Sequence, residues 1–215
     1  MKVFRDRVDA GQQLAMKLRQ FAGRADAIVL ALPRGGVPVA AEVARKLNLS
    51  LDVLVVRKLG APDQPELAMG AIASSGALVM NPEVYGYFAN QKEVVAEITA
   101  RERKELERRE LVYRGTRAPL ELNHRCVILV DDGVATGATM RAAVESARTL
   151  GAAHVVVAAP VCSMEARALL KAAADEVICL EVPRAFYAVG EWYEVFDQTS
   201  DDEVRHLLER TGAPA

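Results

Sequence analysis

Apolar runs of strand length recur along the chain, and most of them are continuous rather than alternating with polar residues. They cover residues 27–32, 51–56, 67–72, 126–130, 154–161 and 176–182. A continuous apolar run is typical of a strand covered on both faces, as in a parallel sheet. Helical periodicity follows several of these runs, at 37–47, 138–150 and 163–174. The alternation predicts right-handed crossovers and a three-layer α/β fold.

The alternation of apolar runs and helical segments is interrupted between the third and fourth runs, where residues 83–116 carry a long, heavily charged helical pattern. Glu97 and Glu105 each precede an arginine by four residues, which is the favourable order on an exposed helix. Acidic residues balance the basic ones, so we expect a solvated helix that acts as a lid, with Gly115 near its hinge, or as an oligomer contact. Residues 60–66 are a second candidate for a moving loop.

The overall composition narrows the class of protein. The 215 residues are 51% hydrophobic and carry a formal net charge of −2, which predicts one globular domain and argues against nucleic acid or an anionic membrane as the main partner. The charged, amphipathic N-terminal segment is not expected to be a signal peptide or a membrane span. Cys126, Cys162 and Cys179 lie in or beside apolar runs, which predicts buried, reduced thiols and a cytoplasmic setting.

Two adjacent carboxylates, Asp131 and Asp132, follow the predicted strand 126–130, and small residues then lead into a helix. In α/β sheets, ligands bind beyond the carboxyl ends of the strands, and a helix N-terminus favours an anion. Carboxylates accept hydrogen bonds from vicinal hydroxyls and bind magnesium. A simple helix cap would explain Thr136 and Thr139 but not the paired acids, so the segment predicts a site for a phosphorylated ribose.

Two more loops at strand ends carry cationic residues. Arg34 precedes Gly35 and Gly36, whose lack of side chains lets a ligand approach the backbone. Arg57 and Lys58 end the second apolar run, where surface solubility is the alternative explanation. Two cationic loops and one acidic loop suit a polyphosphate sugar that chelates a divalent ion.

These residues resemble a known family. The segment VILVDDGVATGATM (127–140) is similar to the phosphoribosyl pyrophosphate signature of the type I phosphoribosyltransferases, and LPRGG (32–36) resembles their pyrophosphate loop. The resemblance covers residues 27–197, with 83–116 as an atypical insert. It implies one three-layer, Rossmann-like domain over residues 1–215, with strand order 3-2-1-4-5-6, strand 3 antiparallel, and an aromatic hood segment at 183–197.

The resemblance also implies roles for individual residues. Asp131 and Asp132 would contact the ribose hydroxyls directly or through magnesium-bound water, and they form the catalytic set with Arg34 and Lys58. Gly35, Gly36 and Arg57 would add to the pyrophosphate contacts, and a cis peptide bond is implied between Pro33 and Arg34. The 5-phosphate would be held by Ala135, Thr136, Gly137, Ala138 and Thr139.

The implied reaction is displacement of pyrophosphate from the ribose by a nitrogenous base, with magnesium as cofactor, in nucleotide metabolism such as nucleoside salvage. Phe186, Tyr187 and Trp192 are candidates for stacking on the base, or else cover for the sheet edge. Residues 160–170 lack the lysine that purine-specific relatives use, which argues against a purine. A phosphoribosyl-pyrophosphate-binding regulatory module without catalysis is the alternative, and homo-oligomers are compatible with either function.

Overall fold

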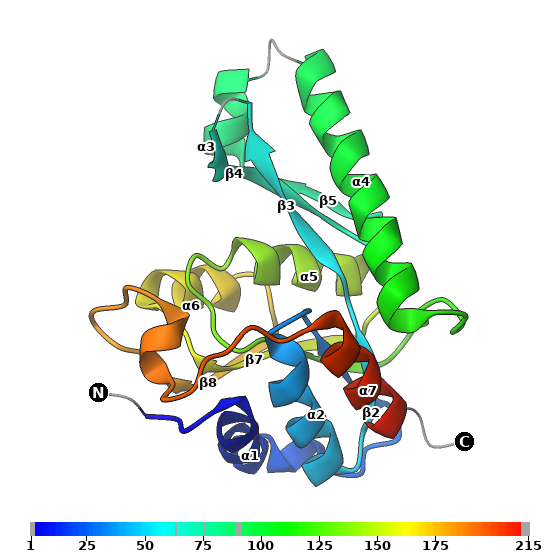
Figure 1. Ribbon diagram of the computed structural model, residues 1–215, viewed down its shortest axis with the longest axis vertical. Coiled ribbons are helices and arrows are strands. Elements are labelled where there is room, and N and C mark those ends of the chain that lie inside the picture. Colours follow the sequence, from blue (N-terminus) through cyan, green and yellow to red (C-terminus); the bar gives the residue numbers. More distant parts are fainter. Residues whose placement is uncertain (1–2, 63, 75, 89–91, 212–215) are drawn as a thin grey trace.

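The computed structural model describes residues 3–62, 64–74, 76–88 and 92–211, and it contains two sheets (Figure 1). The larger sheet is parallel, with the order β2-β1-β6-β7-β8, and the smaller is antiparallel, with the order β3-β4-β5. The predicted α/β fold with a mainly parallel sheet is therefore confirmed. The strands are β1 (Ala27–Ala31), β2 (Ser50–Val53), β3 (Val56–Ala61), β4 (Gln64–Ala73), β5 (Leu78–Met80), β6 (Cys126–Val130), β7 (His154–Val161) and β8 (Glu176–Glu181).

Helices cover both faces of the parallel sheet. The α-helices are α1 (Arg7–Lys17), α2 (Gly36–Leu47), α3 (Pro82–Tyr85), α4 (Lys92–Arg114), α5 (Ala138–Thr149), α6 (Met164–Lys171) and α7 (Asp201–Thr211). Short 3-10 turns are η1 (Arg19–Phe21), η2 (Gly86–Phe88) and η3 (Val189–Trp192).

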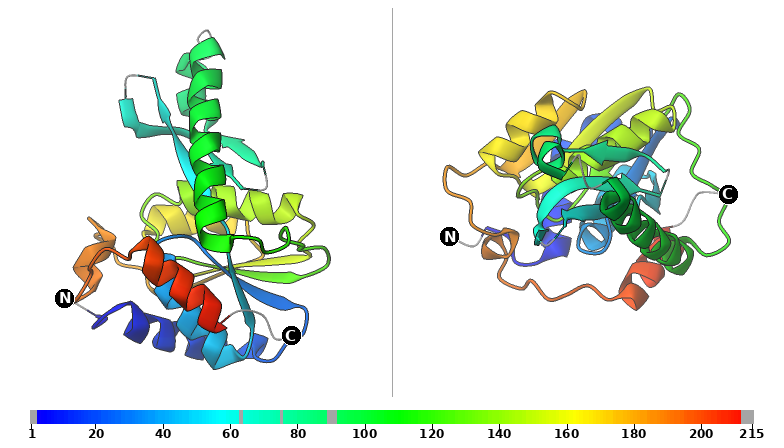
Figure 2. Two further views of the ribbon diagram at one scale, coloured as in Figure 1. Left: turned by 45° about the vertical axis from the view of Figure 1, so that its right-hand side comes forward. Right: turned by 90° about the horizontal axis from the view of Figure 1, so that it is seen from above.

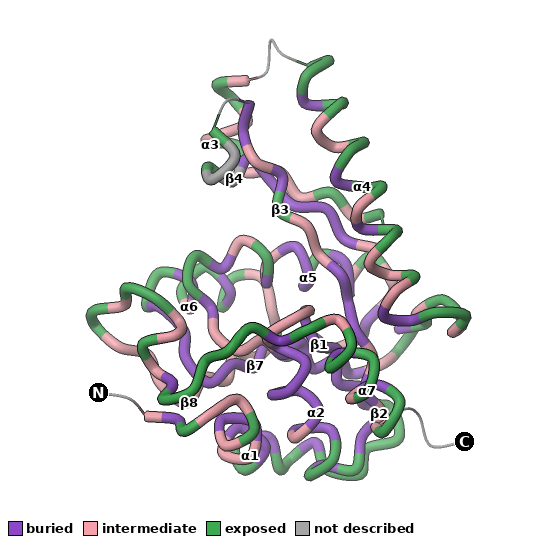
Figure 3. Tube along the Cα trace, in the orientation of Figure 1, coloured by how far each residue is buried: buried purple, intermediate pink, exposed green. Residues whose placement is uncertain are grey.

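Successive residues of a strand point to opposite faces, and the two cores follow this rule. On β1, Val29 and Ala31 belong to the core under α1 and α2. Ile28 and Leu30 belong to the core under α5 and α6. Figure 1 shows the two helix pairs on opposite sides of the sheet, and Figure 3 shows β1 and α2 buried along most of their length. The apolar runs are continuous because helices cover both faces of the strands.

The placement of the third predicted strand needs correction. Residues 67–72 do not form an antiparallel edge beside β2. They lie in β4, which pairs with β3 on one side and β5 on the other. The chain leaves β2 at Val53 and enters β3 almost at once, so the second apolar run is divided between the two sheets. Because β4 has hydrogen-bonding partners on both sides, it has no edge left to extend the parallel sheet.

The small sheet and α4 project from the body as an arm, which we define as residues 56–114 (Figures 1 and 2). The predicted helical insert is thus present, although residues 89–91 lie outside the described residues. At the base of the arm, buried Arg114 donates two hydrogen bonds of 3.1 Å to the carboxylate of Asp52 on β2. Gly115 follows in the left-handed region (φ 56°). This ion pair fixes the C-terminal end of α4 to the parallel sheet beside the predicted hinge.

The cysteines are all free thiols. Cys126 and Cys162 are buried, as predicted, and Cys179 is partly exposed. Among the described residues, the structure has no helix with both the length and the apolar character that a membrane crossing requires.

Candidate functional site

The loops after β1 and β6 lie side by side. The two strands are parallel neighbours, with Ala31 opposite Val130, so both chains leave the sheet at the same edge. The N–H group of Leu32 donates a 2.9 Å hydrogen bond to the Val130 carbonyl, which extends the pairing into the loops. The Pro33–Arg34 peptide bond is cis, as the family resemblance implied. The glycine loop and the acidic loop therefore lie next to each other at this edge of the sheet.

Gly35 and Gly36 are packed directly against the two aspartates. A Cβ atom on Gly35 would lie 2.0 Å from Asp132 Oδ2, and one on Gly36 would lie 2.9 Å from Asp131 Cα. Both distances are below van der Waals contact, so any side chain here would displace an acid or the backbone. The pair of glycines is explained by this close approach.

The two aspartates lie in strained electrostatic surroundings. Burial raises the pKa of Asp131 well above its ordinary value, and the charge of Asp132 raises it further. Burial also raises the pKa of Asp132, while the guanidinium group of Arg7 acts in the opposite direction. Asp131 Oδ1 accepts a 2.9 Å hydrogen bond from the backbone N–H of Asp132. This arrangement favours a bound ligand that supplies hydroxyl donors or positive charge.

Arg7 is a residue of this site that sequence reasoning missed. Its Nε and Nη2 atoms lie 2.9 and 2.7 Å from Asp132 Oδ2, and both side chains are mostly buried. Arg7 begins α1 and is 125 positions away from Asp132 in sequence. The charge run around residues 5–9 gave no indication of a partner, so composition and spacing could not have found this contact.

The small-residue loop ends at the N-terminus of α5. Gly137 adopts the left-handed region (φ 78°), which glycine reaches without strain, and makes no side-chain cap. The first backbone N–H groups of a helix have no partner within it, and their partial positive charge suits a phosphate. Thr136 and Thr139 are exposed beside them. We refer to residues 135–139, the segment predicted to bind an anion, as the cradle.

A cavity of about 860 Å³ opens between this helix end and the arm. Thr136, Ala138 and Arg141 line it from α5 and the loop before it, and Lys58 lines it from β3. The facing wall is apolar and comes mainly from β4, β5 and the start of α3, with Leu67, Val79, Met80 and Val84. Arg141 was not predicted as a site residue; its half-buried guanidinium group has no ion pair with any described residue. Arg141 on the side of the cradle and Lys58 on β3 therefore line the same cavity.

Comparison with known proteins decides the family. The profile described as "Phosphoribosyl transferase domain" matches residues 5–203. The chain belongs to the phosphoribosyltransferase family. The family inferred from the sequence motifs is thereby confirmed.

Individual relatives agree with this assignment. Proteins named "Putative phosphoribosyl transferase" from two strains of Mycobacterium tuberculosis are each 49% identical over 210 residues, or 98% of this chain and 47% of the relative. The chain thus spans about half the length of these relatives. The crystal structure of TT1426 from Thermus thermophilus is 45% identical, with a TM-score of 0.85, over 99% of this chain and 100% of that one.

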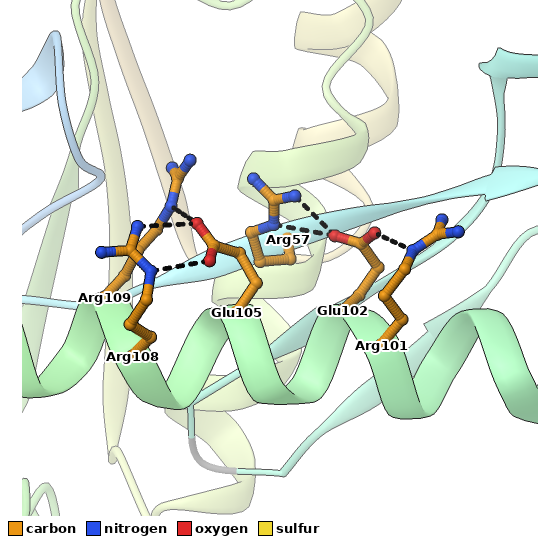
Figure 4. A network of polar contacts seen from close by, with 6 residues as sticks. All are labelled: Arg57, Arg101, Glu102, Glu105, Arg108 and Arg109. Carbon is orange, nitrogen blue, oxygen red and sulfur yellow. Dashed lines mark hydrogen bonds and ion pairs between the residues drawn. The ribbon is translucent and has the colours of Figure 1, made fainter.

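The cationic pair Arg57 and Lys58 is divided between two faces of β3. Consecutive strand residues point in opposite directions, and Arg57 and Lys58 do so on β3. The Arg57 guanidinium donates hydrogen bonds of 3.0 and 2.5 Å to Glu102 of α4 (Figure 4), while Lys58 lines the cavity. Arg34 is partly exposed, and its Nη1 lies 3.6 Å from Asp201 Oδ1 at the start of α7. Lys58 is therefore better placed than Arg57 for a phosphate ligand.

The aromatic candidates do not form one wall. Tyr187 is 83% exposed, whereas Trp192 packs against the core cluster of Phe4 and Tyr193. Phe186 is half-buried. Tyr193 is the aromatic residue that reaches the site, because its hydroxyl donates a 2.5 Å hydrogen bond to the backbone carbonyl of Asp132. The structure thus assigns the C-terminal segment a supporting contact with the acidic loop.

Proposed function

We propose that this chain is a phosphoribosyltransferase, which transfers the 5-phosphoribosyl group of phosphoribosyl pyrophosphate to a nitrogenous base. One observation carries the proposal: the partly buried aspartate pair lies against Gly35 and Gly36, and the short loop that follows it leads into the N-terminus of α5. A sugar with a phosphate at one end and a pyrophosphate at the other matches this arrangement, in which the acids lie between the glycine loop and the start of α5. Family membership supports the same ligand.

The cradle and the two aspartates bind different parts of the sugar phosphate. The N–H groups at the start of α5, with the hydroxyls of Thr136 and Thr139, bind the 5-phosphate. Asp131 and Asp132 lie at the carboxyl end of β6 and accept hydrogen bonds from the ribose hydroxyls. Arg141 lines the same cavity as Thr136 and adds positive charge near this phosphate.

Pyrophosphate is the leaving group, and positive charge must compensate the charge it gains. Arg34 and the backbone of Gly35 and Gly36 bind it on one side, and Lys58 approaches from the arm. The acids fit a magnesium ion that arrives with the substrate, because magnesium in proteins is usually held by one or two carboxylates together with substrate phosphates and water. When bound, the ion would neutralise the phosphates.

The reaction breaks the bond between the anomeric carbon and the pyrophosphate oxygen, and forms a bond from that carbon to a nitrogen of the base. The pyrophosphate leaves with the bonding electron pair, and the base loses a proton from the attacking nitrogen. An oxocarbenium-like centre must be kept from water until the base reacts. The apolar wall that the arm presents above the cradle is suited to this exclusion.

A binding module without catalysis is the second candidate. The ion pair between Arg57 and Glu102 is the observation that favours a binding module, because this pairing removes one cation from the predicted pyrophosphate contacts. The three free thiols support a reducing, cytoplasmic setting for either function.

The test separates binding from turnover. Calorimetry would measure phosphoribosyl pyrophosphate binding with and without magnesium, and pyrophosphate release would then be measured with a panel of purine, pyrimidine and pyridine bases. The enzyme requires binding and base-dependent release. Binding without release for any base supports the module, and absence of binding under all conditions contradicts both.

A further inference from the structure

The guanidinium group of Arg7 joins three parts of the chain that meet at the candidate site. It donates a 2.9 Å hydrogen bond from Nε to Asp132 Oδ2, forms an ion pair with the same oxygen through Nη2 at 2.7 Å, and donates a 2.6 Å hydrogen bond to the backbone carbonyl of Asp197. Its central carbon lies 4.0 Å from the ring centroid of Phe196. The Arg7 side chain is 13% exposed, so these contacts use most of its surface.

The same group lies over the glycine loop. The Cβ position of Gly35 is 3.2 Å from Arg7 Nη2 and 2.0 Å from Asp132 Oδ2. The ion pair therefore rests on the backbone that is proposed to bind pyrophosphate. A change in the Arg7 side chain would alter the position of the carboxylate against this loop, as well as the local charge.

The two aspartates are not equivalent, because Arg7 pairs with one of them. Asp132 Oδ2 accepts a hydrogen bond from Arg7 Nε and forms an ion pair with Arg7 Nη2. Asp131 has no ion pair with any described residue, and its hydrogen bond at Oδ1 comes from the Asp132 backbone. Arg7 thus compensates the charge of Asp132, whereas Asp131 interacts with Asp132 itself and has no cationic partner among the described residues.

We propose that Arg7 is a positioning residue of the phosphoribosyl pyrophosphate site. It holds the Asp132 carboxylate against Gly35 and so fixes the geometry in which the acidic pair meets the ribose hydroxyls. This inference rests on the proposed function, since it assigns roles within the same site. Arg7 acts through Asp132, so its contribution to ligand binding depends on the presence of that carboxylate.

The competing explanation is a structural clamp that fastens α1 to the C-terminal segment. A clamp contributes to the melting temperature and leaves ligand affinity unchanged once the protein is folded. A positioning residue changes affinity, and its effect is coupled to its partner. Affinity, rather than stability, therefore distinguishes the two roles.

The experiment is a double-mutant cycle on the full chain, read by calorimetric titration with phosphoribosyl pyrophosphate and magnesium. The variants are Arg7→Gln, Asp132→Asn and the double substitution, with Arg7→Lys as the conservative change. Arg5→Gln is the matched control, because Arg5 lies in the same segment, is 66% exposed and pairs with Asp6 rather than with the site.

We expect Arg7→Gln to weaken binding roughly 10- to 100-fold, the range seen when groups that orient a ligating side chain are removed. Arg7→Lys keeps the charge and should recover part of the affinity. In the Asp132→Asn background, Arg7→Gln should change affinity less than about twofold, because the interaction that it removes is already absent. Arg5→Gln should bind like the wild type.

Two results would overturn the inference while the proposed function stands. One is wild-type affinity in both Arg7 variants; the other is an equal loss from Arg7→Gln with and without the Asp132 carboxylate. Should Arg7→Gln fail to fold, Arg7→Lys in the two Asp132 backgrounds gives the same comparison. If the wild-type protein itself binds no phosphoribosyl pyrophosphate, the proposed function is what fails.

Discussion

Arg57 of β3 and Glu102 of α4 form an ion pair that joins the strand and the helix of the arm across 45 positions of sequence. Glu102 is almost buried and accepts a further hydrogen bond from Arg101, while Glu105, one turn later, is held by Arg108 and Arg109 (Figure 4). The long charged helix is thus fixed on its sheet-facing side by Glu102, although its overall composition is that of a solvated helix.

Replacing Glu102 with Gln should loosen the arm. The amide accepts weaker hydrogen bonds from Arg57 than a carboxylate does, so we expect a loss of roughly 1–2 kcal/mol in the local opening free energy of the arm. Hydrogen exchange in residues 92–114 should become faster while exchange in the parallel sheet stays the same. Glu107→Gln is the control, since Glu107 is exposed and outside this network. Equal exchange in the two variants would contradict the role of the ion pair.

Ligand binding should protect the arm. The cavity lies between the arm and α5, so a ligand in the cradle places groups against β4 and β5. We expect phosphoribosyl pyrophosphate with magnesium to slow hydrogen exchange in residues 83–116 or 60–66, the two segments predicted to move; residues 63 and 89–91 lie outside the described residues. Because Arg114 fixes the base of α4 to β2, the far end should gain the most protection. Unchanged exchange in both segments would exclude a lid.

The two aspartates should differ in their effect on stability. Asp132→Asn leaves the mostly buried Arg7 without a charged partner and should cost roughly 1–3 kcal/mol, less than a fully buried pair. Asp131→Asn removes a buried carboxylate beside a like charge and should stabilise the ligand-free protein. Because of the Arg7 contact, relief of the repulsion between the two acids is expected to leave folding undisturbed only in the Asp131 variant. Chemical denaturation of the single variants measures the difference, and equal free energies of unfolding would contradict it.

The raised pKa of Asp131 also predicts a pH dependence. The folded protein holds this proton more tightly than the unfolded chain, in which the pKa is about 3.8. The contribution of Asp131 to stability is therefore greatest below this value and is lost as the pH rises towards the raised pKa. The Asp131→Asn variant should lack that loss, so its advantage over the wild type should grow with pH through the weakly acidic range. A constant difference between about pH 4 and pH 8 would argue against a shifted Asp131.

Gly35→Ala should abolish ligand binding with a smaller effect on folding. The added Cβ atom would overlap Asp132 Oδ2, so the carboxylate must move away from the loop and from Arg7. Titration with phosphoribosyl pyrophosphate should show at least a roughly tenfold loss of affinity, comparable to removing a positioning group. Gly86→Ala is the matched control, because no atom lies within 4 Å of its Cβ position. Wild-type affinity in Gly35→Ala would contradict the close packing of the two loops.

Local sequence patterns were sufficient to predict those parts of the fold in which consecutive residues are all buried, or in which a loop directly follows a strand. The continuous apolar runs at 27–32 and 126–130 predicted buried parallel strands, and the positions of Gly35 and Asp132 after those strands predicted one crevice. The run at 67–72 was equally apolar, but its pairing depended on β3 and β5, which the runs did not reveal. Arg7 and the separation of Arg57 from Lys58 were missed because both depend on contacts that are distant in sequence.

The hydroxyl of Ser163 accepts a hydrogen bond from the backbone N–H of Ala166 in α6 and donates one of 2.6 Å to the carbonyl of Ala135. One side chain thus couples the start of α6 to the loop that leads into α5, and the backbone pairing of Val134 with Cys162 reinforces the link. The anion cradle is consequently preorganised: little conformational entropy remains to be lost there on binding. Induced fit on ligand binding is then expected in the arm. The rate at which the arm closes and the strength of phosphate binding are properties of separate structural elements. Evolution or design can therefore adjust each of them independently.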